Sequence, residues 1–408
     1  MSTPSRAAAL PAAHARFLDV RYFGSLDGLR ALSVLAVVWH HTAGTGRTGL
    51  AGRGSLGVEF FFAISGFLIT TLLLRERDRY GRISLRDFYA RRTLRIFPLY
   101  YATLALYVGL TLATSRRSTP SGQAFLADLP AFLTYTSNWF VGSGDAVTFY
   151  FAWSLATEEQ FYLFWPPLLV LLMTVARGRF AVPVVALLAL LAVDAVVTAL
   201  TAEPRGLPVV VLVSLATPIL AGAALAVVLH APAGFRAVAP ALGWRWTPLV
   251  LLLLVLVLAP VDDGLVLVGL VMSLVVASCC VREDHVLAPL LRWAPLRWTG
   301  VISYGVYLLH QLAANLVEAG LGLDEGPLLF VATVPVTLVA AWLSYRFFET
   351  PVLRYKRRFE RGPSAVCPRT GEPLTAGPHH EADVVGTGRA PAPPRTLTAA
   401  DPHPSAPG

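Results

Sequence analysis

Residues 26–44 read LDGLRALSVLAVVWHHTAG and join an apolar run to ionisable side chains at both ends. A largely apolar stretch of this length predicts a membrane-spanning helix. Asp27 and Arg30 lie near its beginning, and His40 and His41 lie near its end. Ionisable groups inside a span are costly and usually mark a function. The rest of the sequence should therefore explain why this helix carries them.

Composition predicts an integral membrane protein. Of its 408 residues, 55% are hydrophobic and only 14% are charged, whereas soluble domains carry about 25% charged residues. Spanning-length apolar runs recur throughout, so we predict an all-α polytopic membrane helix bundle of about ten transmembrane helices. The predicted spans are 26–43, 55–74, 97–114, 153–176, 181–201, 208–230, 247–260, 264–281, 299–320 and 328–348.

Arginine placement predicts the orientation of the bundle. Residues 75–95 alone contain eight arginines, and basic loops stay on the cytoplasmic side. We therefore expect cytoplasmic termini, a cytoplasmic N-terminal segment 1–21 without a cleavable signal, a membrane domain 22–353, and a tail 354–408 that is basic and then disordered. The Arg-rich net charge of +8 indicates a GC-rich genome rather than a nucleic-acid partner. The cysteines Cys279, Cys280 and Cys367 form neither a disulfide framework nor a zinc site.

Helical geometry predicts which ionisable residues of the first span share one face of the helix. Arg30 and His41 are eleven residues apart, about 20° from three full turns, so they share one face about 16 Å apart along the axis. Asp27 precedes Arg30 by one turn and could pair with it. Alternatively, Asp27 caps the helix and Arg30 extends to the lipid headgroups.

The second and third spans also carry polar groups. Glu59 begins the apolar run of residues 57–69, and Ser65 and Gly66 are small enough to let another helix approach closely. Arg91, Arg92 and Arg95 lead directly into Ile-Phe-Pro-Leu-Tyr. They could be a cytoplasmic anchor, or they could bind the phosphates of a donor such as a coenzyme A thioester.

Residues 153–162, WSLATEEQFY, bring two acids into the fourth predicted span. Ser154 and Glu158 share one face, and Glu159 shares the next with Tyr162. Such charges either face a wet cavity or belong to an interfacial aromatic belt that includes Trp153.

The last two predicted spans carry one histidine and one acid. Ser303, Tyr307 and His310 share one helical face, where His310 is either functional or a hydrogen-bonded packing residue. Glu349 could simply pair with Arg346 or Arg354.

Taken together and in this order, these stretches resemble the acyltransferase-3 family of integral membrane acyltransferases. The resemblance runs from about Tyr22 to Arg354. It implies a fold of about ten helices, an acyl-CoA donor, and essential roles for Arg30 and His41. Some members carry an additional extracytoplasmic hydrolase-like domain; here we expect the acceptor site to lie within the bundle.

The resemblance suggests a mechanism in the cell membrane. Arg91, Arg92 and Arg95 hold the phosphates of acyl-CoA, expected to be acetyl-CoA, and Arg30 orients this donor. His41 acts as a general base on the acceptor hydroxyl, or carries the acyl group itself. The other candidate site residues, for substrate contact or support of the base, are Glu158, Glu159, Tyr162, Trp153, Ser154, Tyr307 and His310.

Several alternatives stay open. The acceptor could be a carbohydrate, a cell-surface polysaccharide or a glycosylated natural product such as a macrolide. We expect no bound cofactor and no metal, with acyl-CoA as a co-substrate. The alternative functions are a transporter or flippase that uses the same buried charges as a substrate path, and a scaffold or sensor.

Overall fold

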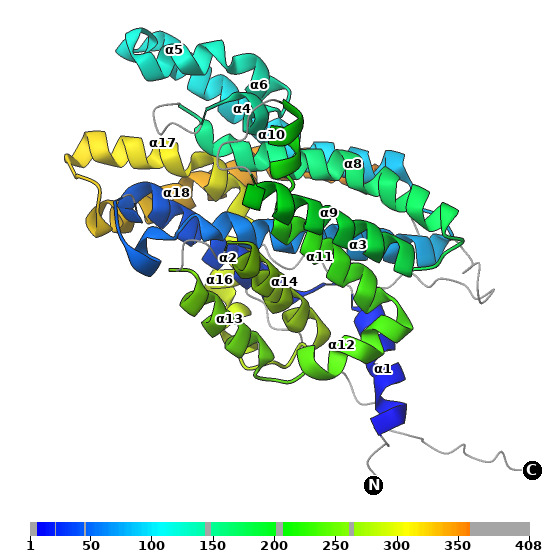
Figure 1. The fold of residues 1–408 in the computed structure, drawn as a ribbon. Coiled ribbons are helices and arrows are strands. Elements are labelled where there is room, and N and C mark those ends of the chain that lie inside the picture. Colours follow the sequence, from blue (N-terminus) through cyan, green and yellow to red (C-terminus); the bar gives the residue numbers. More distant parts are fainter. Residues whose placement is uncertain are drawn as a thin grey trace, which may run out of the picture. The chain divides into compact units, whose positions relative to one another are not determined.

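The computed structural model describes residues 6–20, 22–44, 46–142, 148–200, 207–260 and 265–359. Every regular element in these ranges is helical (Figure 1), which confirms the all-α prediction for this part of the chain. The chain divides into two units, Met1–Arg361 and Gly362–Gly408. The second unit, which includes Cys367 and the predicted disordered tail, lies outside the described residues.

The longer helices overlap the predicted apolar runs, except α1 and α12, where no span was predicted. In chain order they are α1 (Arg6–Asp19), α2 (Gly24–Trp39), α3 (Leu56–Tyr80), α4 (Leu85–Ala113), α8 (Trp153–Val175), α9 (Ala181–Leu200), α11 (Thr217–His230), α12 (Pro232–Leu242), α13 (Thr247–Leu258), α14 (Leu265–Val281), α17 (Ser303–Leu321) and α18 (Pro327–Ser344). The short helices are α5 (Pro120–Ala127), α6 (Leu129–Leu133), α7 (Ser137–Phe140), α10 (Leu207–Val213), α15 (Ala288–Leu291), α16 (Ala294–Val301) and α19 (Thr350–Leu353). Two π-helical turns matter for the site, η1 (His40–Gly44) and η6 (Tyr345–Glu349), and the last described element is the 3-10 turn η7 (Arg354–Phe359).

Length and composition test the spans only in part. Among the described residues, three helical runs are long and apolar enough to cross a membrane alone: Leu56–Tyr80, Leu85–Ala113 and Pro327–Lys356. Two bent helix pairs, one of them containing α2, could raise the number to five. Three shorter apolar helices, Ala181–Val197, Thr247–Leu258 and Val266–Val281, fall below spanning length. The ten spans and the cytoplasmic termini therefore stay predictions.

The third span begins earlier than the sequence predicted. Helix α3 ends at Tyr80 and is capped by Gly81, whose φ of 72° is left-handed, a conformation that glycine adopts readily. The Ser84 side chain then accepts a hydrogen bond from the Asp87 amide and caps α4. Helix α4 consequently begins at Leu85 rather than near residue 97, and Arg91 and Arg95 lie inside the helix.

Two other predicted spans are broken. The run 208–230 forms α10 and α11, because Pro218 lies in the first turn of α11 and favours a helix start there. The run 299–320 is divided at Ile302, which separates α16 from α17. Arg95 contacts the chain at this second break, and α17, which carries His310, begins directly after it.

Helix α3 lies at the centre of the described bundle. It packs most extensively on α11, which runs beside it (Figure 1). A Cβ atom on Gly66 would lie 1.9 Å from the Ile219 carbonyl oxygen, and one on Gly222 would lie 2.4 Å from that of Ala63. This contact confirms the prediction that the small residues of α3 allow close helix approach.

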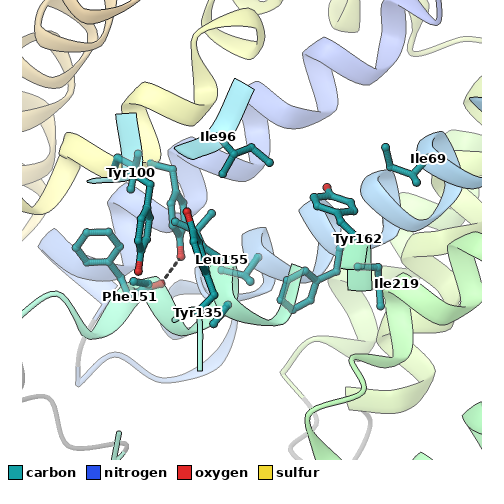
Figure 2. Close-up of a cluster of buried hydrophobic side chains, with 14 of the residues drawn as sticks. Ile69, Ile96, Tyr100, Tyr135, Phe151, Leu155, Tyr162 and Ile219 are labelled. Carbon is teal, nitrogen blue, oxygen red and sulfur yellow. Dashed lines mark hydrogen bonds between the residues drawn. The ribbon is translucent and has the colours of Figure 1, made fainter. Parts of the chain in front are cut away.

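Two hydrophobic clusters meet along α3. One involves α4, α8 and α17, and the other involves α2 and α12–α14, where Cys279 and Cys280 are buried free thiols. In the first cluster, the rings of Tyr100 and Tyr135 stack with centroids 4.3 Å apart. Figure 2 shows these two rings near Phe151 at one end of the cluster and Tyr162 at the other. The candidate site is built along this first cluster.

Candidate active site

His41 lies in a π-helical turn at the end of the first predicted span. Helix α2 ends at Trp39, and the chain continues as η1 through His40–Gly44. Such turns are rare and often occur at functional sites, because the additional residue redirects side chains. The half-buried His41 ring has its Nδ1 atom 3.0 Å from the Val37 carbonyl oxygen.

His310 contacts His41 directly. The Nε2 atom of His310 lies 3.3 Å from Nδ1 of His41, and the ring centroids are 4.9 Å apart. His310 comes from α17, has no exposed surface, and bonds through Nδ1 to the Tyr307 carbonyl oxygen. The sequence marked both histidines but did not predict that they form a pair.

The two backbone contacts determine the tautomer of each ring. A carbonyl oxygen only accepts hydrogen bonds, so the Nδ1 atoms of His41 and His310 must both carry hydrogen. His310 Nε2 then accepts from His41 Nδ1, which shares its hydrogen with the Val37 carbonyl. The lone pair of neutral His41 is therefore on Nε2, the atom that can act as a base.

Tyr307 and Ser154 surround the histidine pair. The Tyr307 hydroxyl donates to the Phe151 carbonyl oxygen at 2.7 Å, and Ser154 Oγ lies 2.5 Å from the same hydroxyl. The Phe151 ring lies edge-on to His310 with centroids 5.1 Å apart. The beginning of α8 and the polar face of α17 thus meet at His310, a contact that the sequence did not predict. Trp153 instead packs edge-on against Phe62.

Glu158 of α8 is the centre of a second polar group and links α8 to α3. Its Oε1 atom accepts hydrogen bonds from Ser65 of α3 and from Tyr162, one turn later on α8. The guanidinium of Arg92 lies over the Tyr162 ring, 4.0 Å from its centroid. The half-buried Glu159 interacts electrostatically with the same arginine. Ser65, interpreted from the sequence as a packing residue, is therefore also a hydrogen-bond donor.

The three arginines of α4 contact different partners. Arg91 pairs with Glu76 at 3.3 Å and donates to the Phe359 carbonyl oxygen of η7 at 2.8 Å. Arg92 covers Tyr162 as described above. Arg95 contacts Glu349 of η6 and the Val301 carbonyl oxygen of α16. The described contacts thus distribute these side chains over several elements rather than in one cluster.

Glu349 pairs with Arg95 rather than with a neighbour in sequence. Its Oε2 atom lies 3.5 Å from Arg95 Nη1, and its side chain is only 5% exposed. The prediction that Glu349 pairs with Arg346 or Arg354 was wrong, because Glu349 is buried at the end of the π turn η6 and contacts Arg95 of α4. Arg95 also donates to the Val301 carbonyl oxygen at 3.3 Å, at the break between α16 and α17.

Asp27 and Arg30 form the pair predicted at the beginning of α2. Arg30 Nη1 lies 3.3 Å from Asp27 Oδ1, and the Tyr22 hydroxyl donates to Asp27 Oδ2. The alternative of Asp27 as the helix cap is wrong, because α2 begins at Gly24 and Phe23 is its N-cap residue.

The apolar helices indicate a helical membrane protein, and the contact between His41 and His310 marks its candidate active site. Comparison with known proteins identifies the family. The sequence profile described as "Acyltransferase domain" matches residues 23–346. The chain therefore belongs to this acyltransferase family, which confirms the resemblance drawn from its motifs.

Two curated relatives are similar over most of the chain. The "Putative peptidoglycan O-acetyltransferase YrhL" of Bacillus subtilis is 32% identical over 81% of this chain and 55% of its own length. The "Peptidoglycan O-acetyltransferase OatA" of Listeria monocytogenes is 31% identical over 81% of this chain and 56% of its own length. The chain thus spans about half the length of the curated relatives it matches. No solved structure matches the chain.

Proposed function

We propose that this protein is an O-acyltransferase of the cell membrane that moves an acetyl group from acetyl-CoA to a hydroxyl of a cell-wall carbohydrate. The observation that carries the proposal is the contact between His41 and the buried His310, within a chain of an acyltransferase family. The names of the relatives favour peptidoglycan as the acceptor over a macrolide, and acyl transfer over transport.

His41 would act as the general base. Its Nε2 atom takes the proton of the acceptor hydroxyl while the hydroxyl oxygen attacks the thioester carbonyl carbon. The carbon–sulfur bond then breaks, and the leaving thiolate takes that proton back from the imidazolium. Acetyl ester and free coenzyme A are the products, so atoms and charge balance. In the covalent alternative, His41 Nε2 attacks the thioester and releases the thiolate, and the acceptor hydroxyl then attacks the acyl-histidine, which forms the ester and frees His41.

His310 would stabilise the imidazolium that forms. Its Nε2 lone pair faces His41 Nδ1, and a hydrogen bond to a charged donor is stronger than one to a neutral donor. Ser154 and Tyr307 would act indirectly, because they fix α17 to the Phe151 carbonyl. These contacts hold the His310 ring against His41.

Glu158, Tyr162 and Glu159 would line the acceptor side. Ser65 and Tyr162 both donate to Glu158, so its carboxylate is fixed in place and can accept from a sugar hydroxyl. Trp153, at the beginning of the same helix, offers an aromatic surface for a sugar ring. The acyl donor would approach from the cytoplasmic side, toward Arg30 and Arg95.

Transacylation in membranes tests the proposal. Membranes that contain the wild type, His41→Ala or His40→Ala would receive labelled acetyl-CoA together with one acceptor. The acceptor would be peptidoglycan fragments in one series and a macrolide in the other. General-base catalysis contributes about 10²- to 10⁴-fold, so His41→Ala should lose this factor at equal protein level. His40→Ala, the adjacent control, should lose much less.

Three outcomes distinguish the alternatives. Label on peptidoglycan fragments that depends on His41 supports the proposal. Undiminished transfer by His41→Ala removes this residue from the mechanism. Net movement of a solute without consumption of the donor would indicate a transporter instead.

A further inference from the structure

Three arginines from three helices interact electrostatically with Asp27 at the beginning of α2, and Arg30 also pairs with it directly. We propose that Arg297 of α16, together with Arg30 and Arg95, forms a binding site for the phosphate groups of the acyl donor. Arg297 belongs to none of the sequence motifs that predicted the site. The inference rests on the proposed function and identifies where its donor is held.

Helix α16 touches α2 directly at Asp27. A Cβ atom on Gly300 would lie 1.9 Å from the Asp27 carbonyl oxygen, so only glycine allows the two backbones to meet there. Arg297 precedes Gly300 by one turn and therefore lies on the same face of α16. Its guanidinium lies 5.8 Å from the ring centroid of Tyr22, whose hydroxyl donates to Asp27.

Arg95 reaches the same place from α4. Its contact with the Val301 carbonyl oxygen, at 3.3 Å, is one residue beyond Gly300. Both Arg95 and Arg297 interact electrostatically with the Asp27 carboxylate that Arg30 binds. Glu349 fixes Arg95 on its other side, so it is a positioning residue for this site.

The charges of the group favour an anion. Three guanidinium groups face two carboxylates, Asp27 and Glu349, which leaves a surplus of one positive charge. The side chains of Arg30 and Arg95 are 28% and 30% exposed, so a ligand can reach them. Arg297 Nε is buried without a hydrogen-bond partner among the described residues. Phosphate oxygens match the planar donors of arginine and would satisfy this nitrogen.

The distance to His41 fits the shape of the donor. Arg30 and His41 are separated by about 16 Å along α2. In coenzyme A, an extended pantetheine arm of comparable length separates the phosphates from the sulfur. Phosphates held at Arg30, Arg95 and Arg297 would therefore let the thioester reach His41. Arg91, by contrast, is already engaged by Glu76 and the Phe359 carbonyl.

Binding of coenzyme A without turnover tests the site. The full chain would be placed in phosphatidylcholine nanodiscs, and the Kd for coenzyme A measured. A charge-assisted hydrogen bond lost in Arg297→Gln should raise Kd about tenfold or more. Arg297→Lys keeps the charge but not the planar fork, so its Kd should be intermediate. Arg236→Gln, an exposed arginine of α12, is the matched control and should bind like the wild type.

The outcomes separate this inference from the proposed function. Equal Kd values for the wild type, Arg297→Gln and Arg297→Lys would overturn the site while leaving acyl transfer intact. Absence of coenzyme A binding by the wild type would contradict the proposed donor itself. An anionic phospholipid headgroup offers the same phosphate chemistry, so retention of labelled phosphatidylglycerol would be measured in parallel. If Arg297→Gln loses the lipid and keeps coenzyme A, the site binds lipid and the inference is wrong.

Discussion

Replacing His310 with leucine should slow acyl transfer by about 10- to 150-fold without weakening donor binding. His310 lies on α17 and meets His41 through Nε2 at 3.3 Å. Leucine is apolar and fills a similar space, so it removes the acceptor atom without leaving a large cavity. The substitution therefore isolates the hydrogen bond from the packing role that an intramembrane histidine could also have.

The magnitude follows from the type of bond that is lost. His41 becomes positively charged when it takes the hydroxyl proton, and its Nδ1–H then points to His310 Nε2. Hydrogen bonds to charged groups contribute about 1.5–3 kcal/mol, and each 1.36 kcal/mol in the barrier is tenfold in rate. Because the charge exists mainly in the transition state, kcat should fall and the Kd of coenzyme A should stay constant.

Single-turnover transfer from labelled acetyl-CoA measures this effect, with His310→Gln as the matched variant. Glutamine places an amide oxygen near the position of Nε2 and should restore part of the rate. Thermal unfolding of both variants checks that the fold persists. If His310→Leu transfers acetyl groups as fast as the wild type, His310 has a packing role only. If the His310→Gln and His310→Leu variants transfer acetyl groups equally slowly, the hydrogen-bond acceptor at position 310 does not determine the rate.

Two further predictions concern the scaffold. Gly66→Ala should destabilise the protein by about 1–3 kcal/mol through overpacking, because its Cβ would meet the Ile219 carbonyl oxygen at 1.9 Å; Gly109→Ala, with nothing within 4 Å, should leave the thermal unfolding temperature unchanged or higher. In the loop after α14, burial together with the Arg292 charge lowers the pKa of His285 to about 4. The unfolded chain binds that proton at about pH 6.5, so stability should fall by about 3 kcal/mol as the pH drops from 6.5 to 4. His285→Gln should remove most of this pH dependence of the unfolding temperature. If the pH dependence is unchanged in this variant, protonation of His285 does not cause the loss of stability.

The sequence predicted the positions of the helices better than their ends. Apolar runs locate segments that avoid water, and all ten predicted runs coincide with described helices or pairs of helices. The ends depend on local features within a few residues, such as the Ser84 cap that begins α4 twelve residues early. Pro218 likewise divides a run that hydrophobicity alone makes continuous.

The sequence predicted contacts between neighbouring site residues but not contacts between distant ones. The pair Asp27–Arg30 follows from helical spacing and was predicted. The pairs Arg95–Glu349 and His41–His310 join segments far apart in the chain, and no spacing rule within one helix relates them. Arg91 and Arg95 are one turn apart on α4, yet their ion-pair partners come from different elements, α3 and η6.

The ionisable residues of α2 have a physical explanation in this structure. Asp27 and Arg30 lie in the first turns of α2, and His40 and His41 lie in the π turn η1 that follows it. The residues between them include Ala31, Val34 and Val37, which have no exposed surface. A rigid apolar segment thus holds an arginine layer and a histidine layer at a fixed separation. A donor with phosphates at one end and a thioester at the other needs both layers at once, whereas a transported solute would need a continuous polar path. The apolar middle of α2 therefore favours acyl transfer over transport along this helix.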